Sequence, residues 1–157
     1  MRPDKDHWAM ELVRVTAQRS TCLRRQVGCV LLNARGHVLA TGYNGVAAGL
    51  PHCNQLDEVH DFKNDYVSEP FACPGAHAPS GTQLDGCQAI HAEQNALLQC
   101  RDVYEIHTCV VSASPCMTCT KLLLNTGCRR ILFDEEYPHV QAAELWRSAG
   151  RSWEQLV

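Results

Sequence analysis

The stretch TCVVSASPCMTCTKLLLNTGCRRILF, residues 108–133, begins and ends with a short apolar run and has a leucine-rich run between them. The four-residue segments 108–111 (TCVV) and 130–133 (RILF), each with three apolar residues and turn residues nearby, are consistent with buried strands. Pro115 suits the first turn of a helix, and Gly127 follows the last leucines, as is common where a helix ends. The stretch therefore predicts a strand–helix–strand unit with a right-handed crossover, in a sheet that is covered by helices.

The same patterns continue on both sides of this unit. Apolar runs predict strands at Val27–Leu32 and Val38–Ala40, which the turn residues Asn33–Gly36 join as a hairpin. Helical periodicity is found in three further segments, from Trp8 to about Ser20, over Ile90–Cys100 and over Val140–Ala149. The order αββαβαβα indicates an α/β fold.

Composition restricts the class of protein. The chain has 157 residues, of which 45% are hydrophobic and 20% charged, so we expect one globular domain over residues 1–157. No apolar run approaches the ~20 residues of a membrane span, and the charged first six residues do not resemble a secretory signal, so we expect a cytoplasmic protein with no membrane partner. The net charge of −3 argues against binding to duplex nucleic acid.

Ten cysteines in such a chain require an explanation. Cys29, Cys109 and Cys128 lie in or beside apolar runs, and Cys100 ends a predicted helix, so these four are expected to be ordinary core residues. The remaining cysteines are candidates for chemistry: Cys22, Cys53, Cys73, Cys87, Cys116 and Cys119.

Two short motifs predict a metal site. Cys116 and Cys119 are three residues apart at a helix start, so both project from one face, where the helix dipole favours the thiolate. His91 and Glu93 lie in the first turn of another helix. One His and two Cys ligands leave a fourth position for water, as in catalytic zinc sites, and Glu93 would move protons beside the metal. The alternative, a core histidine beside half a zinc finger or a redox pair, leaves Glu93 without a role.

A long segment from Val46 to Ala89 has little periodicity, although structureless connections beyond about 12–15 residues are uncommon. Residues Asn54–Phe62 could form a helix. A second, closed metal site would order the rest, because metal-binding energy is also folding energy. Free thiols in a loop are the alternative. The available donors are Cys22, Cys53, Cys73, His77 and Cys87.

The pairing of H-x-E with P-C-x-x-C is the signature of zinc-dependent nucleobase deaminases. Together with other phrases it makes the chain resemble the deoxycytidylate deaminases of the cytidine deaminase superfamily. The resemblance implies a three-layer α-β-α fold with a mixed central sheet flanked by helices. It also implies hydrolytic deamination of dCMP to dUMP in pyrimidine nucleotide metabolism, with release of ammonia. The matching phrases are residues 19–22 (RSTC), 26–28 (QVG), 42–45 (GYNG), 91–96 (HAEQNA) and 115–119 (PCMTC).

The same resemblance implies residue roles. Zinc would be held by His91, Cys116 and Cys119, with Glu93 as the proton shuttle. The roles implied for substrate binding are the sugar 3′-hydroxyl for Asn44, the phosphate for Arg24, the base for backbone groups at Ala92, and closure over the nucleotide for Tyr137. From the residues alone, Asn44 also fits an Asn-Gly turn, Arg24 is more typical of a solvated charge, and Tyr137 is equally a rim tyrosine.

Relatives of this kind also suggest a second, structural zinc, with Cys22, Cys53 and Cys87 as ligands and either Cys73, our choice, or His77 as the fourth. They further suggest a homo-oligomer, a hexamer in many relatives, and dCTP and dTTP as effectors. C5-substituted dCMP stays possible as a substrate. The alternatives are another deaminase of the superfamily, acting on tRNA adenosine, guanine or a riboflavin precursor, and a non-catalytic zinc-binding module.

Overall fold

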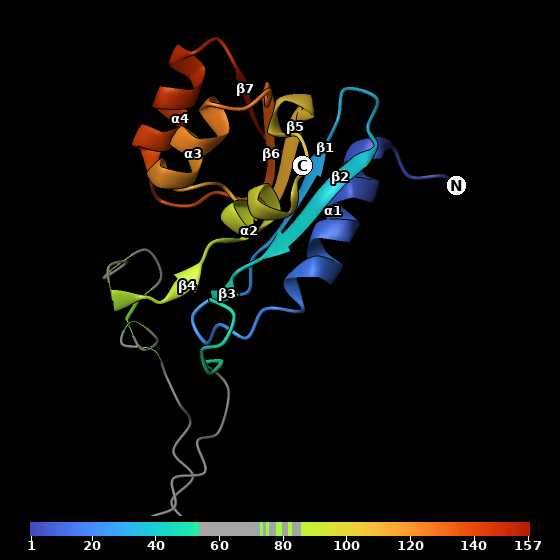
Figure 1. Ribbon diagram of the computed structural model, residues 1–157. Helices are drawn as coiled ribbons and strands as arrows, with labels where there is room; N and C mark the ends of the chain where they lie inside the picture. The colour runs from blue at the N-terminus through green and yellow to red at the C-terminus, as the bar shows by residue number, and fades with distance from the viewer. Residues whose placement is uncertain (54–72, 74, 76–77, 80–81, 83–85) are drawn as a thin grey trace, which may run out of the picture.

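The computed structural model describes residues 1–53, 73, 75, 78–79, 82 and 86–157 (Figure 1). The predicted helix at Asn54–Phe62 and the alternative ligand His77 lie outside these residues. Within the described ranges, no helix combines the length and apolar character needed to cross a membrane. The elements are α1 (Lys5–Ala17), β1 (Gly28–Leu32), β2 (Val38–Tyr43), β3 (Gly45–Val46), β4 (Ala89–Ile90), α2 (Ala92–Gln99), the 3₁₀ turn η2 (Val103–Glu105), β5 (Thr108–Ala113), α3 (Met117–Leu124), β6 (Arg130–Glu135), α4 (Val140–Ser148) and β7 (Ser152–Gln155).

The central sheet is mixed, as predicted. Its five strands lie in the order β2-β1-β5-β6-β7. Strand β1 is antiparallel to both β2 and β5, whereas β5, β6 and β7 are parallel to one another. The short strands β3 and β4 pair separately, with Gly45 opposite Ile90. This small ribbon pairs the residues at the two ends of the segment from 46 to 89.

Helices cover both faces of the sheet, which confirms the three-layer prediction (Figure 1). Side chains alternate between the two faces of a strand. Cys29 and Leu31 of β1 pack in the core that includes residues of α2, α3 and α4. Val30 and Leu32 pack on the other face, against α1. All four are at most 5% exposed, so β1 is buried on both faces.

Some boundaries differ from the predictions. Helix α1 ends at Ala17 instead of near Ser20, because the backbone N–H groups of Arg19 and Ser20 turn back to the last carbonyls of the helix. The helix predicted between Pro115 and Gly127 covers Met117–Leu124, and β2 continues to Tyr43. Strand β7 was not predicted. Its sequence, SWEQ, is short and mostly polar, and Trp153 is its one residue in the core.

One close approach sets the position of α2. A Cβ atom on Gly42 of β2 would lie 2.2 Å from the Ala92 carbonyl oxygen and 2.4 Å from the Ala96 backbone nitrogen. Because Gly42 has no side chain, the first turns of α2 pack directly on β2. This contact fixes the position in space of the start of α2, and therefore the positions of the residues at its N-terminus.

Candidate active site

Two helices begin at the same end of the sheet and face one another. His91 is the N-cap of α2 and Cys116 is the N-cap of α3, both in extended backbone conformations. The His91 backbone N–H donates to Gln94 Oε1 at 2.9 Å, which holds the first turn of α2 closed. Cys119 follows in the first turn of α3. The structure therefore brings two helix N-termini together, as the motif spacing predicted.

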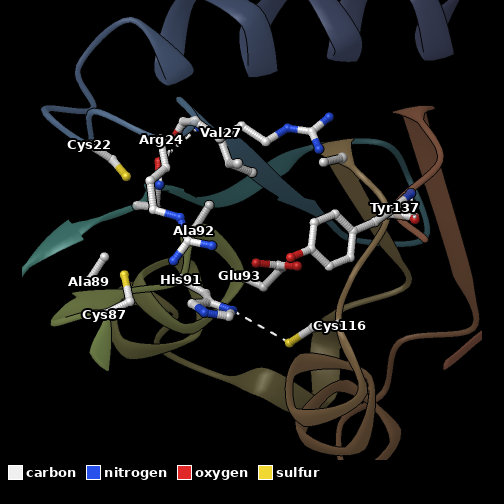
Figure 2. A pocket seen from close by; sticks show the side chains of 14 residues that line it. Cys22, Arg24, Val27, Cys87, Ala89, His91, Ala92, Glu93, Cys116 and Tyr137 are labelled. Atoms are coloured by element: carbon white, nitrogen blue, oxygen red, sulfur yellow. Dashed lines mark hydrogen bonds between the residues drawn. The ribbon is translucent and has the colours of Figure 1, made fainter. Parts of the chain in front are cut away.

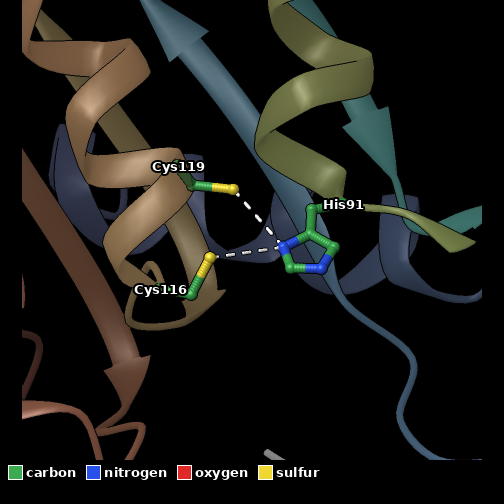
Figure 3. Close-up of side chains that lie close together, drawn as sticks. All are labelled: His91, Cys116 and Cys119. Carbon is green, nitrogen blue, oxygen red and sulfur yellow. Dashed lines mark hydrogen bonds between the residues drawn. The ribbon is translucent and has the colours of Figure 1, made fainter. Parts of the chain in front are cut away.

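The donor atoms of this group have the spacing of a tetrahedral zinc site. His91 Nδ1 lies 3.5 Å from Cys116 Sγ and 3.4 Å from Cys119 Sγ (Figure 3). With ordinary Zn–S and Zn–N bond lengths, a tetrahedral ion separates such atoms by ~3.5 Å. In the described part of the chain, this is the one group of three or more His, Cys or acidic ligand atoms that lie within 4.8 Å of one another. The three residues therefore fit zinc.

The two cysteines share their protons unequally. The contact with Cys119, followed by that with His91, lowers the pKa of Cys116 to about 4, despite burial of the thiol. The same contact between the Cys116 and Cys119 side chains raises the pKa of Cys119. One thiolate is thus present at neutral pH, and zinc binding would have to displace the second proton, as is usual for thiolate ligands.

Glu93 is buried beside these ligands and is 4% exposed. Burial raises the pKa of its carboxyl group to about 7, against the opposing effects of its own backbone N–H and of His91. A group with such a pKa can both accept and return a proton at neutral pH. In Figure 2 its carboxylate points into the same pocket as the His91 ring.

The pocket lies at the end of the sheet where β5 and β6 finish. The end of β5, the segment after β6, the residues before β1 and the start of α2 all contribute walls (Figure 2). Ala92, the first residue of α2, is buried in one wall, and its backbone N–H has no partner within the helix. The lining residues are Cys22, Arg24, Arg25, Val27, Asn44, Cys87, Ala89, His91, Ala92, Glu93, Ala113, Ser114, Cys116 and Tyr137.

Asn44 lies in the pocket wall but is also engaged with the backbone. Its Oδ1 accepts from the Val27 N–H and its Nδ2 donates to the Arg25 carbonyl oxygen, both at 2.8 Å. The amide keeps one N–H and one lone pair beyond these bonds. Asn44 therefore orders the segment before β1, and its remaining donor and acceptor are compatible with the predicted contact to a sugar hydroxyl.

Arg24, in the segment before β1, lines the pocket and also contacts residues near 80. Its Nη2 donates to the carbonyl oxygens of Pro79 at 2.6 Å and Thr82 at 2.9 Å. Its Nη1 is buried and has no hydrogen-bond partner among the residues that the structure describes. A buried, unsatisfied donor of a cation is costly, so this group is suited to an anionic ligand.

Tyr137 follows β6, and its ring projects into the pocket (Figure 2). Its backbone N–H donates to Ser114 Oγ at 2.6 Å. Arg25 and Glu135 form an ion pair beside it, and the Arg25 guanidinium lies 5.9 Å from the Tyr137 ring centroid. Sequence reasoning assigned no role to Arg25 or Glu135, because residues 110 positions apart give no local signal of pairing.

The cysteines of the proposed second site lie near one another. Cys53 and Cys73 are buried together, with Cys87 packed against them. Cys22 is close enough to act electrostatically on Cys53 and Cys87. Backbone N–H groups of Gln88 and Gly75 bond to Cys73 and, against the effect of burial, lower its pKa. The lowered pKa suits Cys73 as a thiolate ligand, whereas burial raises the pKa of Cys53 and Cys87. No three of the four sulfur atoms lie within 4.8 Å of one another.

The fold and the site together define a zinc-binding α/β domain in which two of the three metal ligands, His91 and Cys116, line a pocket. Residues 3–135 match the family described as the cytidine and deoxycytidylate deaminase zinc-binding region, and the chain belongs to this family. It is 34% identical over 136 residues to a deoxycytidylate deaminase of Mycobacterium phage D29, covering 86% of this chain and 98% of that protein.

Two further comparisons agree. A deoxycytidylate deaminase of Schizosaccharomyces pombe is 31% identical over 161 residues, which cover 99% of this chain and 45% of that protein. This chain thus spans less than half of the yeast relative. The dCMP deaminase of cyanophage S-TIM5, solved with dCMP and dUMP, has a TM-score of 0.70 at 24% identity, covering 99% of both chains. This structural likeness supports the fold.

Proposed function

We propose that this protein hydrolyses the exocyclic amine of dCMP, giving dUMP and ammonia. The observation that carries the proposal is the buried Glu93 carboxyl group beside three zinc-type donors, two of which line the same pocket as Glu93. The deoxycytidylate deaminases among its relatives support dCMP as the substrate. C5-substituted dCMP remains a second candidate of the same chemistry.

Each residue of the site has a part in this reaction. When bound, zinc would lower the pKa of a water molecule to about 7. Glu93 would take a proton from the attacking water and pass it to N3 of the cytosine, and it would then move the proton of the new C4 hydroxyl to the departing amine, as the C4–N bond breaks and the C4 carbonyl of dUMP forms. The backbone N–H of Ala92, which has no partner within its helix, and the walls around it would hold the base. Asn44 would contact the sugar and Tyr137 would cover the nucleotide.

The proposal is tested by measuring ammonia release from a panel of cytosine nucleosides, nucleotides and C5-modified dCMPs, with tRNA, guanine and a riboflavin precursor included. We expect dCMP to have the highest kcat/KM. Preference for a purine, a riboflavin precursor or tRNA would assign another deaminase reaction. Absence of turnover on the whole panel by zinc-loaded protein would favour a non-catalytic zinc module.

Arg24 is proposed as the phosphate ligand because its buried Nη1 has no partner among the described residues. We expect Arg24→Ala to raise the KM for dCMP by about 10- to 100-fold, the value of a hydrogen bond to a charged group, and to change the KM for deoxycytidine far less. Steady-state kinetics on both substrates check this. Arg35→Ala, which alters an exposed arginine in the β1–β2 turn, is the control. Equal effects on the two substrates would remove Arg24 from the phosphate site.

A second zinc at Cys22, Cys53, Cys73 and Cys87 is proposed from the family resemblance, from the packing of Cys53, Cys73 and Cys87 in one cluster, and from the backbone N–H groups that bond to Cys73. We expect two zinc ions per chain in the unaltered protein and one in Cys87→Ala, measured by elemental analysis after dialysis. Cys100→Ala changes another partly exposed cysteine and should retain two. Two zinc ions in Cys87→Ala would exclude Cys87 as a ligand.

Other features are proposed from the family resemblance. They are the action of residues 1–157 as one domain, a homo-oligomer of hexameric form, and control by dCTP and dTTP. The resemblance and the described contacts support the zinc and nucleotide sites more directly than these features.

A further inference from the structure

Two segments that are far apart in the sequence meet beside the pocket. Arg25 precedes β1, and Glu135 ends β6. Their side chains form an ion pair, in which Arg25 Nη2 donates to Glu135 Oε2. The Arg25 side chain is 28% exposed and that of Glu135 is 72% exposed. The arginine is thus the inner partner, and it lines the pocket while the carboxylate holds it from outside.

The backbone of Arg25 is held in place from within the protein. Its carbonyl oxygen accepts from Nδ2 of Asn44, which is 8% exposed. The neighbouring Val27 N–H donates to the same amide. Because these hydrogen bonds fix the backbone at Arg25, the Cα position of Arg25 is fixed as well. This restricts the directions in which its side chain can extend toward β6.

The Tyr137 ring lies beside the end of this arginine. The Arg25 guanidinium is 5.9 Å from the ring centroid, within the range of a cation–π contact. The backbone N–H of Tyr137 donates to Ser114 Oγ, and the centroid of the His139 ring lies 5.0 Å from that of Tyr137. Among these contacts, that with Arg25 links the ring to the segment before β1.

We propose that Arg25, held by Glu135, is a positioning residue that keeps the Tyr137 ring over the nucleotide pocket. Arg25 joins the segment that carries Arg24 to the segment that carries Tyr137, so that the phosphate side and the base side of the pocket keep a fixed separation. This inference rests on the proposed function, because it assigns a role in binding the same nucleotide.

The two adjacent arginines have different surroundings, which is the reason for assigning them different roles. The charge of Arg25 is compensated by the Glu135 carboxylate. Arg24 contacts neutral carbonyl groups and has a buried N–H without a partner among the described residues. A phosphate would therefore bind more favourably to Arg24. Arg25 already forms an ion pair with Glu135 and a cation–π contact with Tyr137.

A double-mutant cycle tests this role. Arg25→Gln, Tyr137→Ala and the double variant are compared by KM and kcat for dCMP and by KM for deoxycytidine. We expect Arg25→Gln to raise the KM for dCMP by about 3- to 10-fold, with little change in kcat, and to have no further effect once Tyr137 is alanine. Tyr137→Phe keeps an aromatic face, so the dependence on Arg25 should persist in that background.

Arg14→Gln is the matched control. Arg14 pairs with Asp134, the residue before Glu135, but lies outside the pocket lining, so this change should leave the kinetics unaltered. Independent effects of the Arg25 and Tyr137 changes would overturn the inference, as would a loss confined to dCMP and unaffected by Tyr137→Ala, which would make Arg25 a phosphate ligand. Absence of turnover in the unaltered protein would instead overturn the proposed function itself.

Discussion

Glu93→Gln is expected to retain the metal at His91, Cys116 and Cys119 while reducing kcat by about 10²- to 10⁴-fold, the usual contribution of a general acid–base. Glutamine has nearly the same shape but cannot exchange a proton near neutral pH. Glu93 is 4% exposed and lies beside the ligands without being one of them. The substitution therefore removes the group that transfers protons but leaves His91, Cys116 and Cys119 in place. Zinc content by elemental analysis and ammonia release from dCMP measure the two effects separately.

Glu144→Gln, an exposed acid on α4, is the control for the same chemical change and should match the unaltered protein. Loss of zinc from Glu93→Gln would indicate that this carboxylate is a ligand. Retention of most of the activity would indicate that another group moves the protons. Either result would contradict the role assigned to Glu93.

Gly42→Ala is expected to damage the site without changing any residue that touches zinc. The new Cβ atom would lie 2.2 Å from the Ala92 carbonyl oxygen and 2.4 Å from the Ala96 nitrogen, so α2 must move away from β2. Overpacking of this kind costs about 1–3 kcal/mol of the free energy of unfolding. Since His91 and Glu93 lie at the start of α2, we also expect kcat/KM to fall by about 10²-fold, the effect of a misplacement near 1 Å.

The measurements are the midpoint of thermal unfolding, the zinc content and kcat/KM for dCMP. Gly45→Ala is the matched control for stability and zinc content, because a Cβ atom on Gly45 has no neighbour within 4 Å. If Gly42→Ala and Gly45→Ala unfold at the same temperature with equal zinc content, the direct packing of α2 on β2 is not what positions the ligands.

The metal ligands were predictable from the sequence because the constraint is local. Cys116 and Cys119 share one helix turn, and His91 and Glu93 share another. Their spacing therefore predicts that the side chains of each pair lie close enough to meet at a single ion. The strands of the core were predictable for a similar reason. Residues 109–111 and 131–133 are apolar on both faces, as is typical of buried parallel strands.

Other features depend on contacts that no local pattern reports. The Arg25–Glu135 pair joins positions 110 residues apart. Gly42 belongs to a recognisable GYNG phrase, but only the structure shows α2 packed on it. Strand β7 contributes one core residue, Trp153, among polar neighbours, and such an edge strand has too little apolar periodicity to be recognised.

The arrangement of donors around the ion tests the account most directly, and a crystal structure of the zinc-loaded protein would measure it. We expect zinc bound by His91 Nδ1, Cys116 Sγ and Cys119 Sγ, with water as the fourth donor, within hydrogen-bond reach of Glu93. Four protein side chains around this ion, or a Glu93 carboxylate directed away from it, would contradict the proposed deaminase site.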